Sequence, residues 1–213
     1  MNLIIFGPQG CGKGTQAKKL AEKHGLEHIE TGQIFREMAK EETPLGRKIS
    51  ELNEKKEMIP DDVMAEVLEK KLKKIPIEKG LIIDSAPRLV SQIALIEKIF
   101  EKFKRSIDKA ISITLPREES IARISKRYVC SSCGKQFILG EDIKDENDLC
   151  PQCGTKVSQR VDDTPEGVIK RLNTFQAVTV PVIEYYRQKG MLVEVDGRKG
   201  VEEVFADITN KLE

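Results

Sequence analysis

Short apolar runs alternate with helical patterns along the chain. Three of the runs are almost continuously apolar, as expected for strands of a parallel sheet that helices cover on both faces. The stretches between the runs repeat hydrophobic residues at helical spacing. This alternation predicts an α/β fold with an open, doubly wound sheet of five parallel strands. The predicted strands are residues 3–6, 27–30, 81–84, 110–115 and 192–195.

The predicted helices lie between these strands. One covers residues 14–23, and another covers 61–73, opening after Pro60 with two acidic residues that suit the positive end of the helix dipole. A third covers residues 88–103. Near the C-terminus, spaced apolar residues predict one face of a long helix, which we expect to bend at Pro181. That face consists of Val168, Leu172, Phe175, Val182 and Tyr186.

Two segments interrupt the alternation. Residues 30–59 hold two helical patterns without a strand between them. Residues 127–163 hold four clustered cysteines in a polar stretch. We interpret both as insertions that stand out from a core domain formed by residues 1–29, 60–126 and 164–213, and we expect them to move.

A glycine-rich loop separates the first predicted strand from the first predicted helix. Residues 7–13 read G-x-x-x-x-G-K, and a strand before and a helix after are what this phosphate-binding motif requires. Its glycines let backbone N–H groups turn toward phosphate oxygens, and Lys13 would reach the β- and γ-phosphates. The usual hydroxyl residue after the lysine is replaced by Gly14, and the hydroxyl follows on Thr15. The loop predicts binding of a nucleoside triphosphate, with a ligand-free turn as the alternative.

Two residues near this loop invite a chemical interpretation. Asp84 ends the third predicted strand, where phosphate-loop folds place an acid that organises Mg²⁺. A turn-forming residue is the alternative for Asp84. Cys11 lies inside the loop, and no histidine is spaced to activate it. We therefore interpret Cys11 as a packing residue and not as a nucleophile.

The four clustered cysteines form two C-x2-C pairs separated by sixteen residues, and a glycine follows each pair. Four thiolates at this spacing predict a closed tetrahedral site, which is typical of structural Zn²⁺. Iron and disulfides are the alternatives. The predicted ligands are Cys130, Cys133, Cys150 and Cys153.

Charge and hydropathy limit the partners and the location. Lys and Arg number 36 against 35 Asp and Glu, and this net charge of +1 gives no reason to expect nucleic acid or an anionic membrane as a partner. No apolar run approaches the roughly 20 residues of a spanning helix, and the N-terminus does not resemble a signal peptide. We expect a cytoplasmic protein, a monomer by default, although the sequence leaves a homo-oligomer open.

Taken together, the motifs resemble the adenylate kinase family over essentially the whole chain. The phosphate loop ends Gly-Lys-Gly-Thr-Gln-Ala, the variant that this family uses. The resemblance implies a fold like that of the P-loop nucleoside triphosphate hydrolases. It also implies reversible transfer of the γ-phosphoryl group of MgATP to AMP, giving two ADP. The other matching motifs are Thr31-Gly32 with Arg36, Asp84 with Pro87-Arg88 and Gln92, Arg123 with Arg127, Arg160 to Asp163 with Arg171, and Val195-Asp196-Gly197.

The resemblance also implies roles for individual residues. The catalytic residues would be Lys13, Arg88, Arg127, Arg160 and Arg171. ATP would bind Gly10, Cys11, Gly12, Lys13, Gly14, Thr15, Arg123, Arg127 and Lys199. AMP would bind Thr31, Gly32, Arg36, Ile59, Ser85, Arg88, Gln92, Arg160 and Arg171. Thr15 and Asp84 would hold magnesium through water, together with Asp162. Residues 127–163 would be the zinc-binding lid, and residues 30–59 would close on the acceptor nucleotide.

Three departures from the family pattern bear on specificity. Ser85 stands where the family commonly has Gly, Gln33 stands where it has Asp, and Gly200 stands where a Pro often flanks the donor base. We therefore expect relaxed base selectivity, more clearly for the donor.

Three other functions remain open. One is a different nucleoside monophosphate kinase, such as a GTP:AMP phosphotransferase. Another is a phosphate-loop ATPase with a nucleic-acid-binding zinc ribbon, although two Lys against five acidic residues between Cys133 and Cys150 argue against it. The last is a hydrolase that drives a partner protein.

Overall fold

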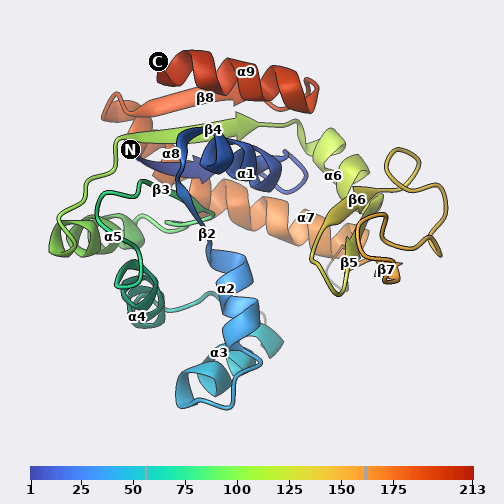
Figure 1. Cartoon of the computed structure of the whole chain (residues 1–213), viewed down its shortest axis with the longest axis horizontal. Helices are drawn as coiled ribbons and strands as arrows, with labels where there is room; N and C mark the ends of the chain where they lie inside the picture. Colours follow the sequence, from blue (N-terminus) through green and yellow to red (C-terminus); the bar gives the residue numbers. More distant parts are fainter. Residues whose placement is uncertain (56, 161–162) are drawn as a thin grey trace.

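A five-stranded parallel sheet forms the centre of the molecule. The computed structural model describes residues 1–55, 57–160 and 163–213. The strand order is β2-β3-β1-β4-β8, with every neighbouring pair parallel, so the predicted doubly wound sheet is confirmed (Figure 1). The strands are β1 (Asn2–Phe6), β2 (Glu27–Glu30), β3 (Leu81–Asp84), β4 (Lys109–Thr114) and β8 (Leu192–Asp196).

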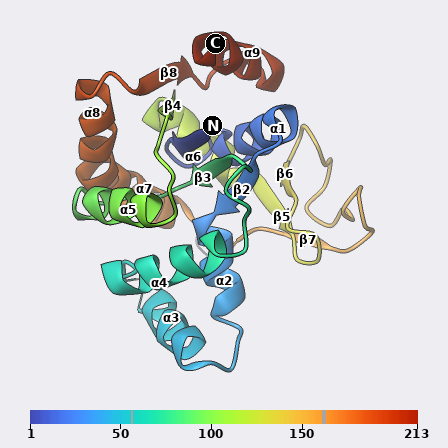
Figure 2. The ribbon, with the colours of Figure 1, turned by 60° about the vertical axis from the view of Figure 1, so that its left-hand side comes forward.

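Helices cover both faces of this sheet, as its continuously apolar strands predict. Successive strand residues point to opposite faces, so Ile4 and Phe6 join one buried cluster, while Leu3 and Ile5 join another. The first cluster packs under α4 (Asp61–Leu72), α5 (Ser91–Lys102) and α8 (Val180–Gln188). The second packs under α1 (Lys13–His24) and α9 (Val201–Leu212), which lie together on the other side of the sheet (Figures 1 and 2).

The long C-terminal helix has an irregular middle. It consists of α7 (Pro165–Thr174), a π-helical segment η1 (Phe175–Thr179) and α8. We expected a bend at Pro181, and the irregularity lies instead on the N-terminal side of that residue. Proline has no N–H to donate four residues back, and its ring crowds the carbonyl there. A wider π turn accommodates both effects.

Two groups of elements lie away from the main sheet (Figure 1). One is the helix pair α2 (Thr31–Met38) and α3 (Pro44–Glu54), as the two helical patterns of residues 30–59 predicted. The other follows α6 (Arg117–Ser125) and is an antiparallel sheet of order β6-β5-β7, which the sequence did not predict. Its strands are β5 (Arg127–Cys130), β6 (Gln136–Ile138) and β7 (Val157–Ser158).

The small sheet has an apolar cluster of its own. Tyr128, Phe137, Ile143 and Val157 are buried together with two of the cysteines. The stretch that we interpreted as polar therefore contains enough scattered apolar residues to form a small core. Among the described residues, no helix is both long and apolar enough to cross a membrane.

Candidate active site

The glycine-rich loop joins β1 to the first turn of α1. Gly10 and Gly12 have φ of 80° and 85°, in the left-handed region that a side chain disfavours. Helix α1 begins at Lys13, so its unpaired N–H groups and its dipole favour an anion held in the loop. The predicted loop therefore has the backbone that phosphate binding requires.

Cys11 supports the loop from beneath. It is buried in the cluster shared with α1 and α9, and a Cβ built on Gly7 would lie 2.4 Å from its Sγ. Burial raises the pKa of the Cys11 thiol, so the group is protonated at neutral pH. These observations support a packing role for this side chain.

Asp84 lies at the end of β3, beside the loop. The residue is 3% exposed, and its Oδ1 accepts a hydrogen bond of 2.7 Å from Ser85 Oγ. Its Oδ2 faces the start of α1, because a Cβ built on Gly14 would lie 3.7 Å from that oxygen. Burial raises the pKa of Asp84, but His28, Lys13 and Ser85 together outweigh burial and lower it. Asp84 is therefore an ionised carboxylate at neutral pH.

The sequence reasoning missed His28. Its Nε2 lies 3.8 Å from Asp84 Oδ2, and this buried nitrogen has no hydrogen-bond partner among the described residues. His28 lies on β2, which pairs with β3 in the sheet. Only knowledge of this strand pairing could have placed the two side chains together.

The oxygen donors beside the loop fit a magnesium ion. Thr15 is exposed in the first turn of α1, and the ionised Asp84 faces the same turn. Magnesium prefers oxygen ligands and keeps several of its waters. Thr15 and Asp84 could therefore hold Mg²⁺ through water, as we expected from the sequence.

The residues expected to bind the acceptor form a hydrogen-bonded chain next to Asp84. Thr31 Oγ1 donates to the carbonyl oxygen of Asp84 at 3.0 Å. Arg88 Nε donates to the carbonyl oxygen of Ser85 at 3.0 Å. The amide oxygen of Gln92 accepts from the backbone N–H of Arg88 at 2.9 Å. The structure thus brings these four predicted residues and Asp84 into one continuous network.

The other predicted acceptor residues lie around this network. Arg36, in the last turn of α2, is half exposed and pairs with Glu30 at 3.0 Å. A Cβ on Gly32 would lie 3.2 Å from the Arg36 guanidinium, so the absence of a side chain there gives the arginine room. Ile59 packs against the cluster under α4 and α5.

A buried carboxylate holds two of the predicted catalytic arginines. The Asp163 side chain has no exposed surface and accepts hydrogen bonds from Arg127 Nε and a terminal nitrogen at 2.8 and 2.6 Å. It also accepts one from Arg171 at 2.7 Å. Arg160 lies in the segment that joins β7 to α7 and is partly buried. Asp162 lies outside the described residues.

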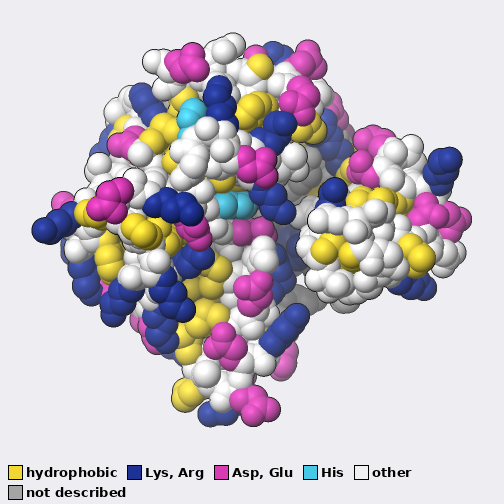
Figure 3. Space-filling view, viewed as in Figure 1, with side chains coloured by type: hydrophobic (Ala, Val, Ile, Leu, Met, Phe, Trp, Pro, Cys, Tyr) yellow, Lys and Arg dark blue, Asp and Glu magenta, His cyan; other side chains and the backbone are white. Residues whose placement is uncertain are grey.

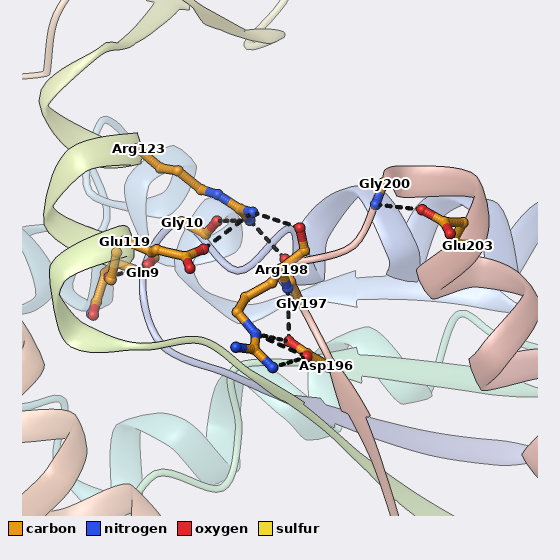
Figure 4. A network of polar contacts seen from close by, with 10 residues as sticks. Gln9, Gly10, Glu119, Arg123, Asp196, Gly197, Arg198, Gly200 and Glu203 are labelled. Carbon is orange, nitrogen blue, oxygen red and sulfur yellow. Dashed lines mark hydrogen bonds and ion pairs between the residues drawn. The ribbon is translucent and has the colours of Figure 1, made fainter.

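Arg123 links the phosphate loop to the turn after β8 (Figure 4). Its guanidinium donates to the carbonyl oxygens of Gly10 and Gly197, at 3.3 and 2.9 Å. A Cβ on Gly197 would lie 3.2 Å from the carbonyl oxygen of Cys11, so this turn packs directly on the loop. The Lys199 ammonium pairs with an acid on α9 at 2.6 Å. Of the predicted ATP-binding residues, Arg123 therefore lies beside the loop, whereas the Lys199 side chain is directed to α9.

Figure 3 shows the surface hollowed between the main body and the lobe of β5 to β7, with Lys and Arg side chains at the edge of the hollow. Such a concentration of cations favours polyphosphate ligands.

The four cysteines meet in that lobe. All four Sγ atoms lie within 4.8 Å of one another, with Cys130 to Cys153 at 3.4 Å and Cys133 to Cys150 at 3.6 Å. Zn–S bonds of about 2.3 Å in a tetrahedron place sulfurs roughly 3.8 Å apart. A disulfide needs about 2.0 Å, so these pairs are not disulfides. The cluster can therefore hold a metal ion, and its donor set fits zinc.

Both cysteine pairs have the same turn. Gly134 N donates to Cys130 O, and Gly154 N donates to Cys150 O, at 3.0 and 2.8 Å. Both glycines have φ near 70°. Thus the glycine after each pair permits the tight turn, or knuckle, that directs two sulfurs toward one point.

Comparison with known proteins finds relatives along the full length. Residues 5–191 match the family model described as adenylate kinase. A protein named adenylate kinase from Kosmotoga olearia is 42% identical over 100% of this chain and 99% of its own length. Proteins of that name from Methanosarcina barkeri and Archaeoglobus fulgidus are 41% and 39% identical, over at least 96% of both chains. The similarity includes both inserted segments as well as the main sheet.

Proposed function

The chain belongs to the adenylate kinase family, and on that premise we propose how its residues perform the reaction. An adenylate kinase is a phosphotransferase that moves the γ-phosphoryl group of ATP to AMP and gives two ADP. We propose that MgATP binds at the phosphate loop and that AMP binds beside α2 and the turn after β3. A cytoplasmic location, where thiols stay reduced, is part of this proposal.

The observation that carries the assignment of the two sites is the network around Asp84. Asp84 faces the first turn of α1 on one side, and its carbonyl oxygen accepts from Thr31 on the other. The carbonyl oxygen of the next residue, Ser85, accepts a hydrogen bond from Arg88. This arrangement would place a magnesium-bearing donor and an arginine-bound acceptor on opposite sides of one short strand end, as transfer between two phosphates requires.

The reaction asks little of a general base, because its transition state is loose and its charge spreads over the phosphoryl oxygens. Lys13 would neutralise the donor phosphates, and Arg36 and Arg88 would hold the acceptor phosphate. Arg127, Arg160 and Arg171 would surround the group in transfer, since planar guanidinium groups bind phosphate oxygens in pairs. Magnesium would supply further charge to the β- and γ-phosphates.

The cysteine lobe would act as a lid. A zinc ion held by four thiolates would tie the two knuckles together, so that the small sheet could move as a unit. Closure would exclude water that could otherwise hydrolyse ATP. Helices α2 and α3 would close over the acceptor in the same way.

The experiment that tests the function is a product assay with Mg²⁺ and purified protein. We expect ADP from ATP plus AMP, and loss of at least about 100-fold in kcat for Lys13→Met. Release of inorganic phosphate without a phosphorylated acceptor would support a hydrolase instead. Faster phosphorylation of another monophosphate would move the assignment to a different nucleoside monophosphate kinase.

We further propose that the donor base is selected weakly, because Gly200 offers no ring to flank it. Gly200 has φ −61° and ψ 157°, which a proline can adopt, although proline loses the hydrogen bond of 3.1 Å that Gly200 N donates to Glu203. A Gly200→Pro variant should therefore raise the preference for ATP over GTP, CTP and UTP, on the order of tenfold in kcat/KM. Gly200→Ala is the matched control, since it adds a Cβ without a ring. Strict ATP selectivity in the unaltered protein would contradict the proposal.

A further inference from the structure

Ser85 has an unusual backbone for a residue with a side chain. Its φ is 69°, in the left-handed region where Cβ approaches a carbonyl oxygen. Among the described non-glycine residues, only Lys104 also has positive φ. Strained residues of this kind concentrate where the side chain or the backbone serves a site. The Ser85 side chain therefore requires an explanation.

The Ser85 hydroxyl binds the buried acid beside the phosphate loop. Its Oγ donates to Asp84 Oδ1 at 2.7 Å, and Asp84 is 3% exposed. Hydrogen bonds to ionised groups are shorter and stronger than neutral ones. The carbonyl oxygen of Ser85 meanwhile accepts from Arg88 Nε. One residue thus touches the carboxylate on the donor side and the guanidinium on the acceptor side.

The two oxygens of Asp84 consequently differ. Oδ1 is bound by Ser85, whereas Oδ2 faces Gly14 at the start of α1 and lies 3.8 Å from His28 Nε2. Rotation of the carboxylate would break the Ser85 hydrogen bond. The hydroxyl therefore fixes the orientation of the carboxylate plane, so that one oxygen stays directed toward the phosphate loop.

We propose that the Ser85 hydroxyl is a positioning group that presents Asp84 Oδ2 to the magnesium waters. This inference rests on the proposed function, in which Asp84 orders the metal of MgATP. Groups that orient metal-binding residues typically change metal affinity by about 10- to 100-fold when removed. Because Asp84 would act through water, we expect the lower end of that range.

The test uses two variants that both lack the hydroxyl but differ in backbone strain. Ser85→Ala keeps the Cβ in the left-handed region, and Ser85→Gly removes it. Ser85→Gly should therefore melt higher than Ser85→Ala, by about 3 °C. Ser106→Ala, an exposed serine before β4, is the matched control. An effect of backbone strain would differ between Ser85→Ala and Ser85→Gly, whereas an effect of the lost hydroxyl would be the same in both.

The readout is the affinity of Mn²⁺ for the enzyme–ATP complex, measured from free Mn²⁺ by electron paramagnetic resonance. Both Ser85 variants should bind Mn²⁺ about tenfold more weakly, with metal-free ATP affinity changed less than twofold. Metal affinity within twofold of the unaltered enzyme in both variants would overturn the inference. So would a loss in Ser85→Ala alone, because strain and not the hydroxyl would then be responsible.

The proposed function can fail separately. If the unaltered protein made no ADP from ATP and AMP, the proposed function would fall and this inference with it. If the unaltered protein were active and the Ser85 variants bound Mn²⁺ normally, only the inference would fall.

Discussion

Replacing Asp163 with Asn should destabilise the protein more than any exposed charge substitution. The Asp163 carboxylate has no exposed surface, and the two hydrogen bonds that Arg127 makes within the described part of the chain both go to it. Asparagine keeps the shape but offers one acceptor oxygen and no charge, so the Arg127 side chain, 11% exposed, loses its counter-ion. With that oxygen at the Oδ1 position, the hydrogen bonds from the terminal nitrogens of Arg127 and Arg171 can persist, whereas Arg127 Nε loses its acceptor Oδ2.

The size of the effect follows from this burial. Breaking a buried ion pair by removing one partner costs roughly 3–5 kcal/mol. The side chain of Arg171 is 24% exposed and can gain water in compensation, so we expect the low end, about 3 kcal/mol. For a chain of this length, each kcal/mol lowers Tm by about 2–4 °C, which gives a decrease of about 6–12 °C.

Calorimetry or circular dichroism would measure this decrease. The control is Asp207→Asn, which removes a partly exposed partner of Lys199 and should cost less than about 1 kcal/mol. In the double variant with Arg127→Met, the two losses should not add, because each removes the same pair. Equal shifts for Asp163→Asn and Asp207→Asn, or additive losses in the double variant, would refute the reasoning.

The remaining predictions concern metal, a buried arginine and pH. Removing the metal with a strong chelator, or replacing Cys130 with Ser, should make the lobe of β5 to β7 unfold at a lower temperature than the main sheet and its helices. Amide hydrogen exchange that rises equally in both parts would contradict this. Arg105→Met should lower the free energy of unfolding in urea by about 2–3 kcal/mol, because Arg105 is 8% exposed and donates to the carbonyl oxygens of Ile75, Pro76 and Lys79. A decrease below about 0.5 kcal/mol would show that these hydrogen bonds contribute little to stability. Hydrogen bonds from Lys71 and Lys79 lower the pKa of Glu27, so the unfolded state binds its proton more tightly. The stability that Glu27 contributes should be present near neutral pH and be lost as the pH falls through its lowered pKa. The Glu27→Gln variant should therefore lose less stability on acidification than the unaltered protein, by up to about 1 kcal/mol. Identical profiles of stability against pH for the two proteins would argue against a contribution from the Glu27 ion pairs.

The parts of the site that the sequence predicted are those held by neighbours along the chain. The phosphate loop needs glycines at particular steps before Lys13, and the metal site needs two cysteines and a glycine at each knuckle. Both are visible in a window of fewer than about ten residues, because turn geometry is set by local φ and ψ. The same holds for the strand and helix alternation, which depends on local periodicity.

Other parts depended on contacts between distant residues. His28 meets Asp84 because β2 pairs with β3, and Arg127 meets Asp163 because the lobe of β5 to β7 begins and ends at adjacent places. The left-handed backbone conformation of Ser85 could not be predicted from the sequence either, since serine rarely adopts it and no local pattern requires it.

By itself, then, the sequence determined the order and type of the main elements, the phosphate loop and the four-cysteine cluster, since each follows from periodicity or spacing along the chain. Only the tertiary structure decided which side chains share a hydrogen bond around Asp84 and Asp163, that β5, β6 and β7 form a small sheet, and where the long helix widens before Pro181. These features depend on strand order and packing between residues far apart in sequence. The hydrogen bonds and ion pairs in these features gain their strength when the groups are buried together, and the pattern of residues along the chain does not show which groups those are.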